Sequence, residues 1–225
     1  MNLLRLTGAV VLLFLTARLI LPGSIASWYS GGKVGYIALS GIIGLAIGDN
    51  ALFAAMIRFG PRRATLIMAC VPIITALLAL GVLNEHLPIT AWIGIIITMI
   101  GVAWVILEKS TGEDGSSPVP GESKWQGMWL GLLAAVCQAV GLILAKSGMG
   151  ETVDPVAATL LRMVAGLSGI VGLVLFQGEF SGLRRALRDK RAMALIGGGT
   201  LVGPFIGVWL SLVAVRYTEQ ASRRH

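Results

Sequence analysis

Charged side chains are scarce in this sequence. Asp, Glu, Lys and Arg together make up 13% of its 225 residues, whereas soluble domains carry about a quarter. Hydrophobic residues make up 56%, and a soluble fold of this length would need more polar surface than such a composition supplies. We therefore expect an integral membrane protein. The 30 glycines agree with this, because glycine is frequent where membrane helices pack closely.

Side chains that bind metals or catalyse reactions are also few. The two cysteines, Cys70 and Cys137, fall in separate apolar runs, and the two histidines, His86 and His225, are far apart. Neither pair has the spacing of a disulfide framework or a metal site. The sequence also lacks the P-loop, Gly-x-Ser-x-Gly and His-Glu-x-x-His patterns, so an ATP-driven pump and a hydrolase have no support. We predict no enzyme activity, no cofactor and no bound metal.

The net charge of +7 raises the question of a nucleic-acid partner. The basic residues lie mostly at the ends of apolar segments, which is the distribution that the positive-inside rule predicts for a membrane protein. We therefore expect no nucleic acid to bind. The expected partners are the lipid bilayer, a small-molecule metabolite and, as a further candidate, a second copy of the chain in a homodimer.

Seven apolar runs reach the length of about 20 residues that crosses a bilayer. They lie at 3–21, 34–57, 64–83, 88–107, 127–145, 155–176 and 192–215. The sequence therefore predicts an all-α bundle of about seven transmembrane helices. Between the fourth and fifth runs, EKSTGEDGSSPVPGESK at 108–124 is rich in Gly, Ser, Pro and acidic residues and predicts a polar linker.

The two halves of the chain are similar to each other. NLLRLTGAVV near the start resembles TLLRMVAGLS in the second half, so that Arg5 corresponds to Arg162. We predict an internal repeat. Its first copy, linker and second copy lie at 1–107, 108–125 and 126–225. From the runs that lack a counterpart, we expect the first copy to lack its first helix and the second copy to lack its last two.

One long stretch of the first half carries a specific pattern. GDNALFAAMIRFGPRRATLIMACVPIITALLALGVLNEHLPITAWIGIIITMIGVAWVI combines a Gly-Asp pair, a small-residue helix ending in glycine, and a helix with a central proline that closes on a glutamate. With GLLAAVCQAVGLILAKSGM and GTLVGPFIGVWLSLVAVRYTEQA in the second half, it resembles the EamA-type members of the drug/metabolite transporter superfamily. The resemblance implies ten membrane helices in two inverted five-helix repeats, of which this chain lacks three.

The resemblance also implies a transporter of small metabolites or drugs, which we expect in a bacterial inner (plasma) membrane. The mechanism would be alternating access, in which the two repeats rock around a cavity lined by the second, third, sixth and seventh runs. Two other classes stay open. A lipid-modifying membrane enzyme would need paired acids or metal ligands at one depth, which the sequence lacks. An inactive scaffold or fragment would leave the intramembrane charge unexplained.

Asp49 and Asn50 stand side by side inside the second apolar run. A charge at the centre of a membrane helix costs roughly 2.5–3.5 kcal/mol on insertion scales. Asp49 is therefore a candidate for a central substrate cavity. Equally, it could anchor the structure by pairing with a buried arginine or by capping a broken backbone. Asn50 is a further cavity candidate, although a hydrogen bond between helices is the better expectation for it.

Arg5 and Arg162 occupy matching places inside their helices. Either could line the cavity and bind anionic groups of a substrate, or could extend its side chain toward the headgroups. A buried ion pair of Asp49 with one of these arginines is a hypothesis, because each charge is costly alone. Trp209, deeper in its run than the other tryptophans, is also a cavity candidate. Glu85 closes the third run, and we expect it at the helix end near the headgroups.

Two apolar runs contain residues that interrupt helices. Pro72, in MACVPIITA, removes a helical hydrogen bond and predicts a kink. Gly203, Pro204 and Gly207, in GGGTLVGPFIGVW, predict a second break, because glycine and proline both weaken the helix there. Transporters often place such breaks at binding sites, where they act as hinges. A kink that serves packing alone is the other interpretation.

Spaced small residues predict close helix contacts. Gly41, Gly44 and Gly48 recur at intervals of three and four in the second run, which places them on one side of a helix. Such glycines let two membrane helices approach backbone to backbone. This role requires no ligand.

Overall fold

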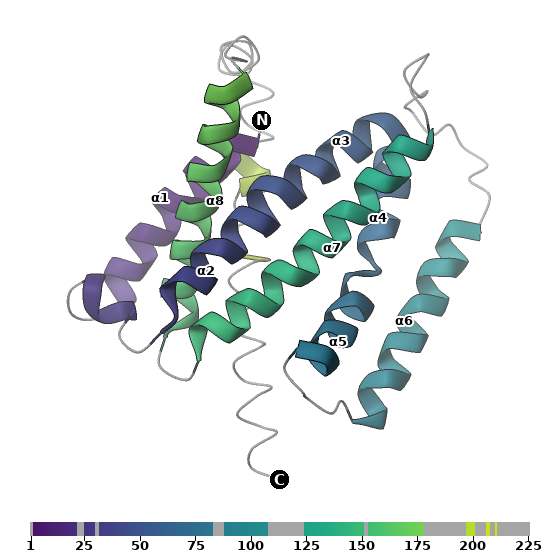
Figure 1. The fold of residues 1–225 in the computed structure, drawn as a ribbon, viewed down its shortest axis with the longest axis horizontal. Helices are drawn as coiled ribbons and strands as arrows, with labels where there is room; N and C mark the ends of the chain where they lie inside the picture. The colour runs from purple at the N-terminus through teal and green to yellow at the C-terminus, as the bar shows by residue number, and fades with distance from the viewer. Residues whose placement is uncertain are drawn as a thin grey trace. The chain divides into compact units, whose positions relative to one another are not determined.

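The computed structural model shows a protein built of helices (Figure 1). It describes residues 2–21, 25–29, 32–82, 88–107, 124–150, 153–177, 197–200, 206–207 and 210. No strand occurs within these ranges, so the expected all-α fold class is confirmed for the described part of the chain. The predicted linker, apart from Lys124 and Trp125, lies outside the described residues, as does most of the seventh apolar run.

Within the described ranges, five helical segments are long and apolar enough to cross a membrane. They are Asn2–Leu19, Val34–Arg58, Pro61–Gly81, Trp125–Met149 and Pro155–Phe176. The shorter apolar stretch Ile89–Gly101 belongs to the fourth predicted run. These helices identify a multi-pass membrane protein, because only helices and closed barrels satisfy the backbone in lipid.

The chain forms two compact units, Met1–Ala46 with Leu144–His225, and Ile47–Ile143. The first unit contains helix α1 (Asn2–Ile20), the short 3-10 segment η1 (Ile25–Tyr29), helix α2 (Val34–Gly41) and helix α8 (Pro155–Gln177). Helix α8 packs against α1, α2 and η1, and Figure 1 shows the three helices side by side. The predicted repeat divides the chain differently from these units and stays a prediction.

Glycines form the contact between α8 and the second span. Gly41 lies directly against the backbone carbonyl of Arg162. A methyl group added at Gly166 would lie 2.9 Å from the Cβ of Leu45, and one added at Gly169 would lie 2.8 Å from the Cβ of Ala46. Larger residues would hold the two backbones apart. The predicted close helix contact is therefore confirmed for Gly41.

The second apolar run is not one continuous α-helix. Helix α2 ends at Gly41, a π-helical segment η2 follows at Ile42–Gly48, and helix α3 begins at Asp49. A π-helix bonds residues five apart instead of four; it is rare, and it frequently occurs at functional sites. Its sequence, IIGLAIG, contains no proline and no charged residue that would indicate an interruption. A continuous α-helix was therefore the expectation for this run.

The second unit contains α3 (Asp49–Phe59), α4 (Pro61–Met68), α5 (Val71–Val82), α6 (Ile89–Leu107) and most of α7 (Lys124–Met149). Gly60 joins α3 to α4 with a positive φ of 94°, a conformation that glycine adopts at little cost. Helix α4 packs against α3 and α6. On α7, a methyl group added at Gly131 would lie 2.9 Å from the Cδ1 atom of Ile67 on α4.

The third span is interrupted in its middle. Helix α4 ends at Met68 and α5 begins at Val71, and between them the N–H groups of Ala69 and Cys70 bond three residues back, at 3.1 and 3.0 Å. Pro72 is the second residue of α5 and has no N–H to donate to the carbonyl of Met68. The interruption thus falls just before the proline that predicted a kink.

Candidate functional site

A buried polar pair connects two membrane spans of the second unit. Asp49, the first residue of α3, is only 6% exposed. Its Oδ1 atom accepts a hydrogen bond of 2.8 Å from Nε2 of Gln138 on α7. Gln138 is itself half-buried. The pair lies inside the apolar segments Val34–Arg58 and Trp125–Met149.

The bond to Gln138 explains how the membrane span tolerates this carboxyl group. A hydrogen bond to a charged group contributes about 1.5–3 kcal/mol, which is similar to the roughly 2.5–3.5 kcal/mol that a charge costs at the centre of a membrane helix. The amide therefore offsets much of the cost. A carboxylate accepts hydrogen bonds and donates none, so a ligand that met it would carry a positive charge or N–H donors.

Asn50 follows Asp49 on α3 and is half-buried. Consecutive residues of a helix point about 100° apart and do not share a face. The two side chains that the sequence singled out together therefore leave α3 in different directions. Gln138 is the residue that the structure adds to Asp49.

A second polar cluster lies in the first unit, around the start of α1. Nη2 of Arg5 donates to Oδ1 of Asn2 at 3.1 Å, and Nδ2 of Asn2 makes a long bond of 3.5 Å to the carbonyl of Leu45 in the π-helical segment. The hydroxyl of Thr200 donates to the carbonyl of Arg5 at 3.3 Å. Asn2 and Thr200 are 7% and 4% exposed. Arg5 is thus held within the unit through Asn2.

Arg162 is the most buried charged residue among those described, at 4% exposure. It lies on α8, eight residues into the segment Pro155–Phe176, and its backbone carbonyl touches Gly41. A guanidinium group stays protonated in proteins, so the first unit carries a permanent positive charge within a membrane span. Asp49 belongs to the other unit, and its ion pair with Arg162 or Arg5 stays a prediction.

The remaining predicted residues fall into two groups. Pro72 lies at the start of α5, and Gly207 lies in a short π-helical turn with Ile206. The other four lie outside the described residues: Glu85, Gly203, Pro204 and Trp209.

Sequence reasoning missed three polar residues that the structure brings into play, Gln138, Asn2 and Thr200. Gln138 had a usable signal, because it is an uncharged polar residue in the middle of the apolar run LGLLAAVCQAVGLILA. Asn2 stands at the start of the chain and Thr200 follows three glycines, where polar residues are common and carry little information.

The described residues contain no group of three or more His, Cys, Asp or Glu side chains that could hold a metal ion. Cys70 is half-buried and Cys137 is buried, and neither forms a disulfide. The polar side chains of the two clusters described above are therefore carboxylate, amide, hydroxyl and guanidinium groups.

Comparisons with known proteins bear on these features. Residues 1–107 match the EamA-like transporter family. The chain is also 30% identical over 175 residues to a curated protein of Bacillus subtilis (strain 168), the "Uncharacterized transporter YyaM". This similarity covers 77% of the present chain and 54% of that relative. The chain thus spans about half the length of the curated relative that it matches.

Proposed function

We propose that the chain is a multi-pass membrane transporter of the drug/metabolite type, because residues 1–107 match the EamA-like transporter family. It moves small metabolites or drugs by alternating access, in the inner (plasma) membrane of a bacterium. The family and the transporter name of the Bacillus relative support a transporter rather than an enzyme.

The observation that carries the proposal is the Asp49–Gln138 pair, a buried carboxyl group fixed by an amide between two membrane spans. Ionisable groups inside membrane spans are expensive and commonly mark substrate or ion pathways. The interrupted span Pro61–Gly81 in the same unit supports the proposal, because discontinuous helices commonly flank the binding sites of secondary transporters. Asp49 would bind the substrate, and Gln138 would hold the carboxylate in place.

The proposal is tested by accumulation measurements in bacterial cells that express the chain. A panel of small fluorescent cations, amino compounds and organic acids is compared in cells with the chain and in cells with the Asp49→Asn variant. We expect at least one compound to be expelled or taken up by the wild-type chain. The variant should lower the initial rate about tenfold or more, the loss expected when a ligand no longer meets a charged acceptor.

The matched control is Asp154→Asn. Asp154 accepts a 2.8 Å bond from the backbone N–H of Val156 at the start of α8, and asparagine caps a helix as well as aspartate does. This variant should transport as the wild type does. Equal rates for Asp49→Asn and wild type would remove the carboxylate from the mechanism. A chain that inserts into the membrane yet changes the accumulation of no compound would contradict the transporter proposal itself.

A further inference from the structure

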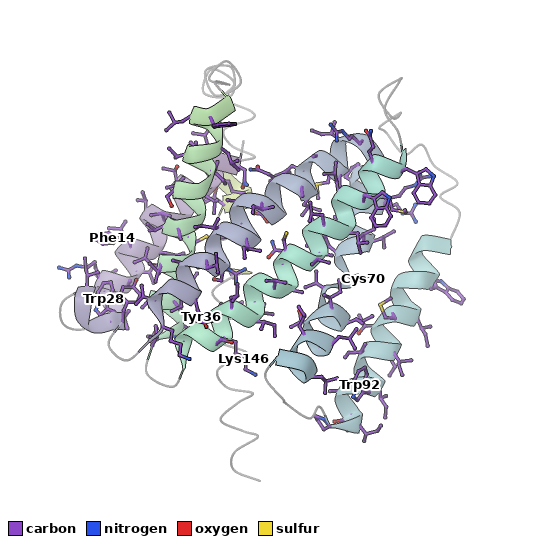
Figure 2. All side chains as sticks on the ribbon, viewed as in Figure 1. Phe14, Trp28, Tyr36, Cys70, Trp92 and Lys146 are labelled. Carbon is purple, nitrogen blue, oxygen red and sulfur yellow. The ribbon has the colours of Figure 1, made fainter. Side chains whose placement is uncertain are left out.

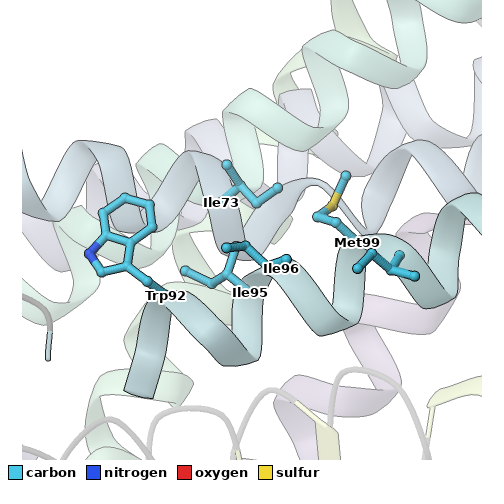
Figure 3. Close-up of a pocket in the computed structure, with 6 residues that line it drawn as sticks. Ile73, Trp92, Ile95, Ile96 and Met99 are labelled. Carbon is cyan, nitrogen blue, oxygen red and sulfur yellow. The ribbon is translucent and has the colours of Figure 1, made fainter. Parts of the chain in front are cut away.

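Two cavities with apolar walls lie on the membrane helices, one in each unit. The cavity of the first unit has a volume of about 480 Å³ and is formed by α1, η1 and α8. The cavity of the second unit has a volume of about 540 Å³ and is formed by α5 and α6. In Figure 3 its walls are Ile73 of α5 and a row of α6 side chains that includes Trp92 and Met99.

The walls of the first cavity face away from the protein core. Phe14 and Leu15 of α1 and Val164 of α8 are 40%, 55% and 43% exposed, and all three line the cavity. Both helices are long and apolar enough to span a membrane. Lipid acyl chains therefore surround this face in a bilayer, and an apolar hollow of this kind admits such a chain.

One basic residue continues the lining row of the first cavity. Val11, Phe14 and Leu15 of α1 line the cavity. Together with Arg18 they occupy positions i, i+3, i+4 and i+7, a spacing that keeps all four residues on one face of the helix. Arg18 is exposed and lies in the last turn of α1. Helical geometry thus places Arg18 one turn beyond Phe14 and Leu15 on the face of α1 that lines the cavity. A guanidinium group is the side chain best suited to bind a phosphate.

The segment η1 places this end of the cavity at the membrane surface. It connects the span Asn2–Leu19 to the span Val34–Arg58. It contains Trp28 and Tyr29; Figure 2 labels Trp28, and it also labels Phe14 of α1. Tryptophan and tyrosine gather at the headgroup level of membranes. The hydroxyl of Tyr29, which also lines the cavity, donates to the carbonyl of Ala157 at 3.1 Å, so it fixes η1 to α8.

Among the described residues, the helices that form the second cavity carry no charge. Neither α5, VPIITALLALGV, nor α6, ITAWIGIIITMIGVAWVIL, contains a charged residue. The two hollows therefore have similar volumes and similar apolar walls, but they differ in the charge on the described helices that form them.

From this difference we propose that the cavity between α1, η1 and α8 binds one acyl chain of an anionic phospholipid, whose phosphate group is bound by Arg18. The cavity between α5 and α6 accepts acyl chains without a preference for the headgroup. This inference is independent of transport activity, because lipid binding is measured on the purified chain.

Native mass spectrometry of the detergent-purified chain measures lipid retention directly. Phosphatidylglycerol and phosphatidylcholine with identical acyl chains are added separately, and the apparent Kd of the tightest bound lipid is compared. We expect phosphatidylglycerol to bind about fivefold more tightly, the ratio that corresponds to about 1 kcal/mol for one basic residue beside an anionic lipid. Arg18→Gln should bring the ratio to about one and leave phosphatidylcholine binding unchanged.

Two filling variants test the cavity itself. Val164→Trp and Leu15→Trp place an indole ring in the hollow from opposite walls, and each should lower the number of retained lipids by one. The control is Arg63→Gln, which removes an exposed charge at the start of α4 in the other unit and should leave the fivefold ratio intact. Equal binding of the two lipids by the wild-type chain would overturn the proposal. So would a loss of preference in Arg63→Gln equal to that in Arg18→Gln, or full lipid retention by both filling variants.

Discussion

Different contacts join the membrane helices of the two compact units. In the first unit, α2 and α8 meet backbone to backbone, with Gly41 against the carbonyl of Arg162. In the second unit, the side chains of Asp49 and Gln138 bridge α3 and α7, and the span Pro61–Gly81 is interrupted. A backbone contact leaves no room for a ligand, whereas a polar side-chain pair offers groups that a ligand can bind. The contact between α2 and α8 in the first unit therefore serves packing, and the Asp49–Gln138 pair in the second unit is the candidate site.

The largest expected loss of stability comes from a substitution at the backbone contact between α2 and α8. In Gly41→Ala, the new methyl group would meet the backbone carbonyl of Arg162, which cannot rotate away as a side chain does. We expect a loss of about 3 kcal/mol, the upper end of the cost of overpacking. Thermal unfolding of the purified chain in detergent measures this loss as a lower Tm.

The matched control lies six residues earlier on the same helix. A methyl group added at Gly35 meets nothing within 4 Å, so Gly35→Ala should hold or raise the Tm, because alanine favours the helix by about 0.5–1 kcal/mol over glycine. Equal losses in the two variants would show that helix α2 tolerates no side chain at either position for reasons unrelated to α8.

A smaller loss is expected from the polar pair of the second unit. Gln138→Leu keeps an apolar side chain on α7 but removes the donor to Asp49, and the unfolding free energy should fall by about 1.5–3 kcal/mol, the worth of a hydrogen bond to a charged group. Gln126→Leu changes an exposed glutamine in the first turn of α7 and should change the Tm little. If the two leucine variants have the same Tm, the bond to Asp49 contributes nothing to stability.

The smallest effect is expected where a glycine meets a side chain instead of a backbone. In Gly131→Ala, the new methyl group would lie 2.9 Å from the terminal Cδ1 atom of Ile67, which can move by changing its rotamer. We expect a loss of about 1 kcal/mol, the lower end of the overpacking range, seen as a Tm between those of Gly41→Ala and wild type. A loss as large as that of Gly41→Ala would mean that the contact between α4 and α7 is as rigid as the contact between α2 and α8.

Much of the fold follows from hydrophobic length alone. Six of the expected apolar runs coincide with described helices, because a span of about 20 apolar residues has few alternatives in a bilayer. The break before Pro72 was predictable, since proline cannot complete the helical bond. The π-helical segment Ile42–Gly48 was not, because its apolar composition suits an α-helix equally well.

Only one of the two residues of the candidate site was predictable from the sequence. Asp49 was identified from the sequence because a carboxylate in an apolar run is costly wherever its partners lie. Its partner Gln138 is 89 residues away, and no local pattern connects the two. A close helix contact at Gly41 was expected from the spacing of small residues, but its partner, Arg162 of α8, depends on how the helices meet and required the structure.

The proposed role of the Asp49–Gln138 pair in transport is tested most directly by one set of initial rates. The rate for the best transported compound is measured for wild type, Asp49→Asn, Gln138→Leu and the double variant. If Gln138 acts by holding the carboxylate, Gln138→Leu lowers the rate in the wild-type chain but has no further effect in the Asp49→Asn chain. If the double variant instead loses rate by the product of the two single-variant factors, the two residues act independently, and this result would contradict a shared site.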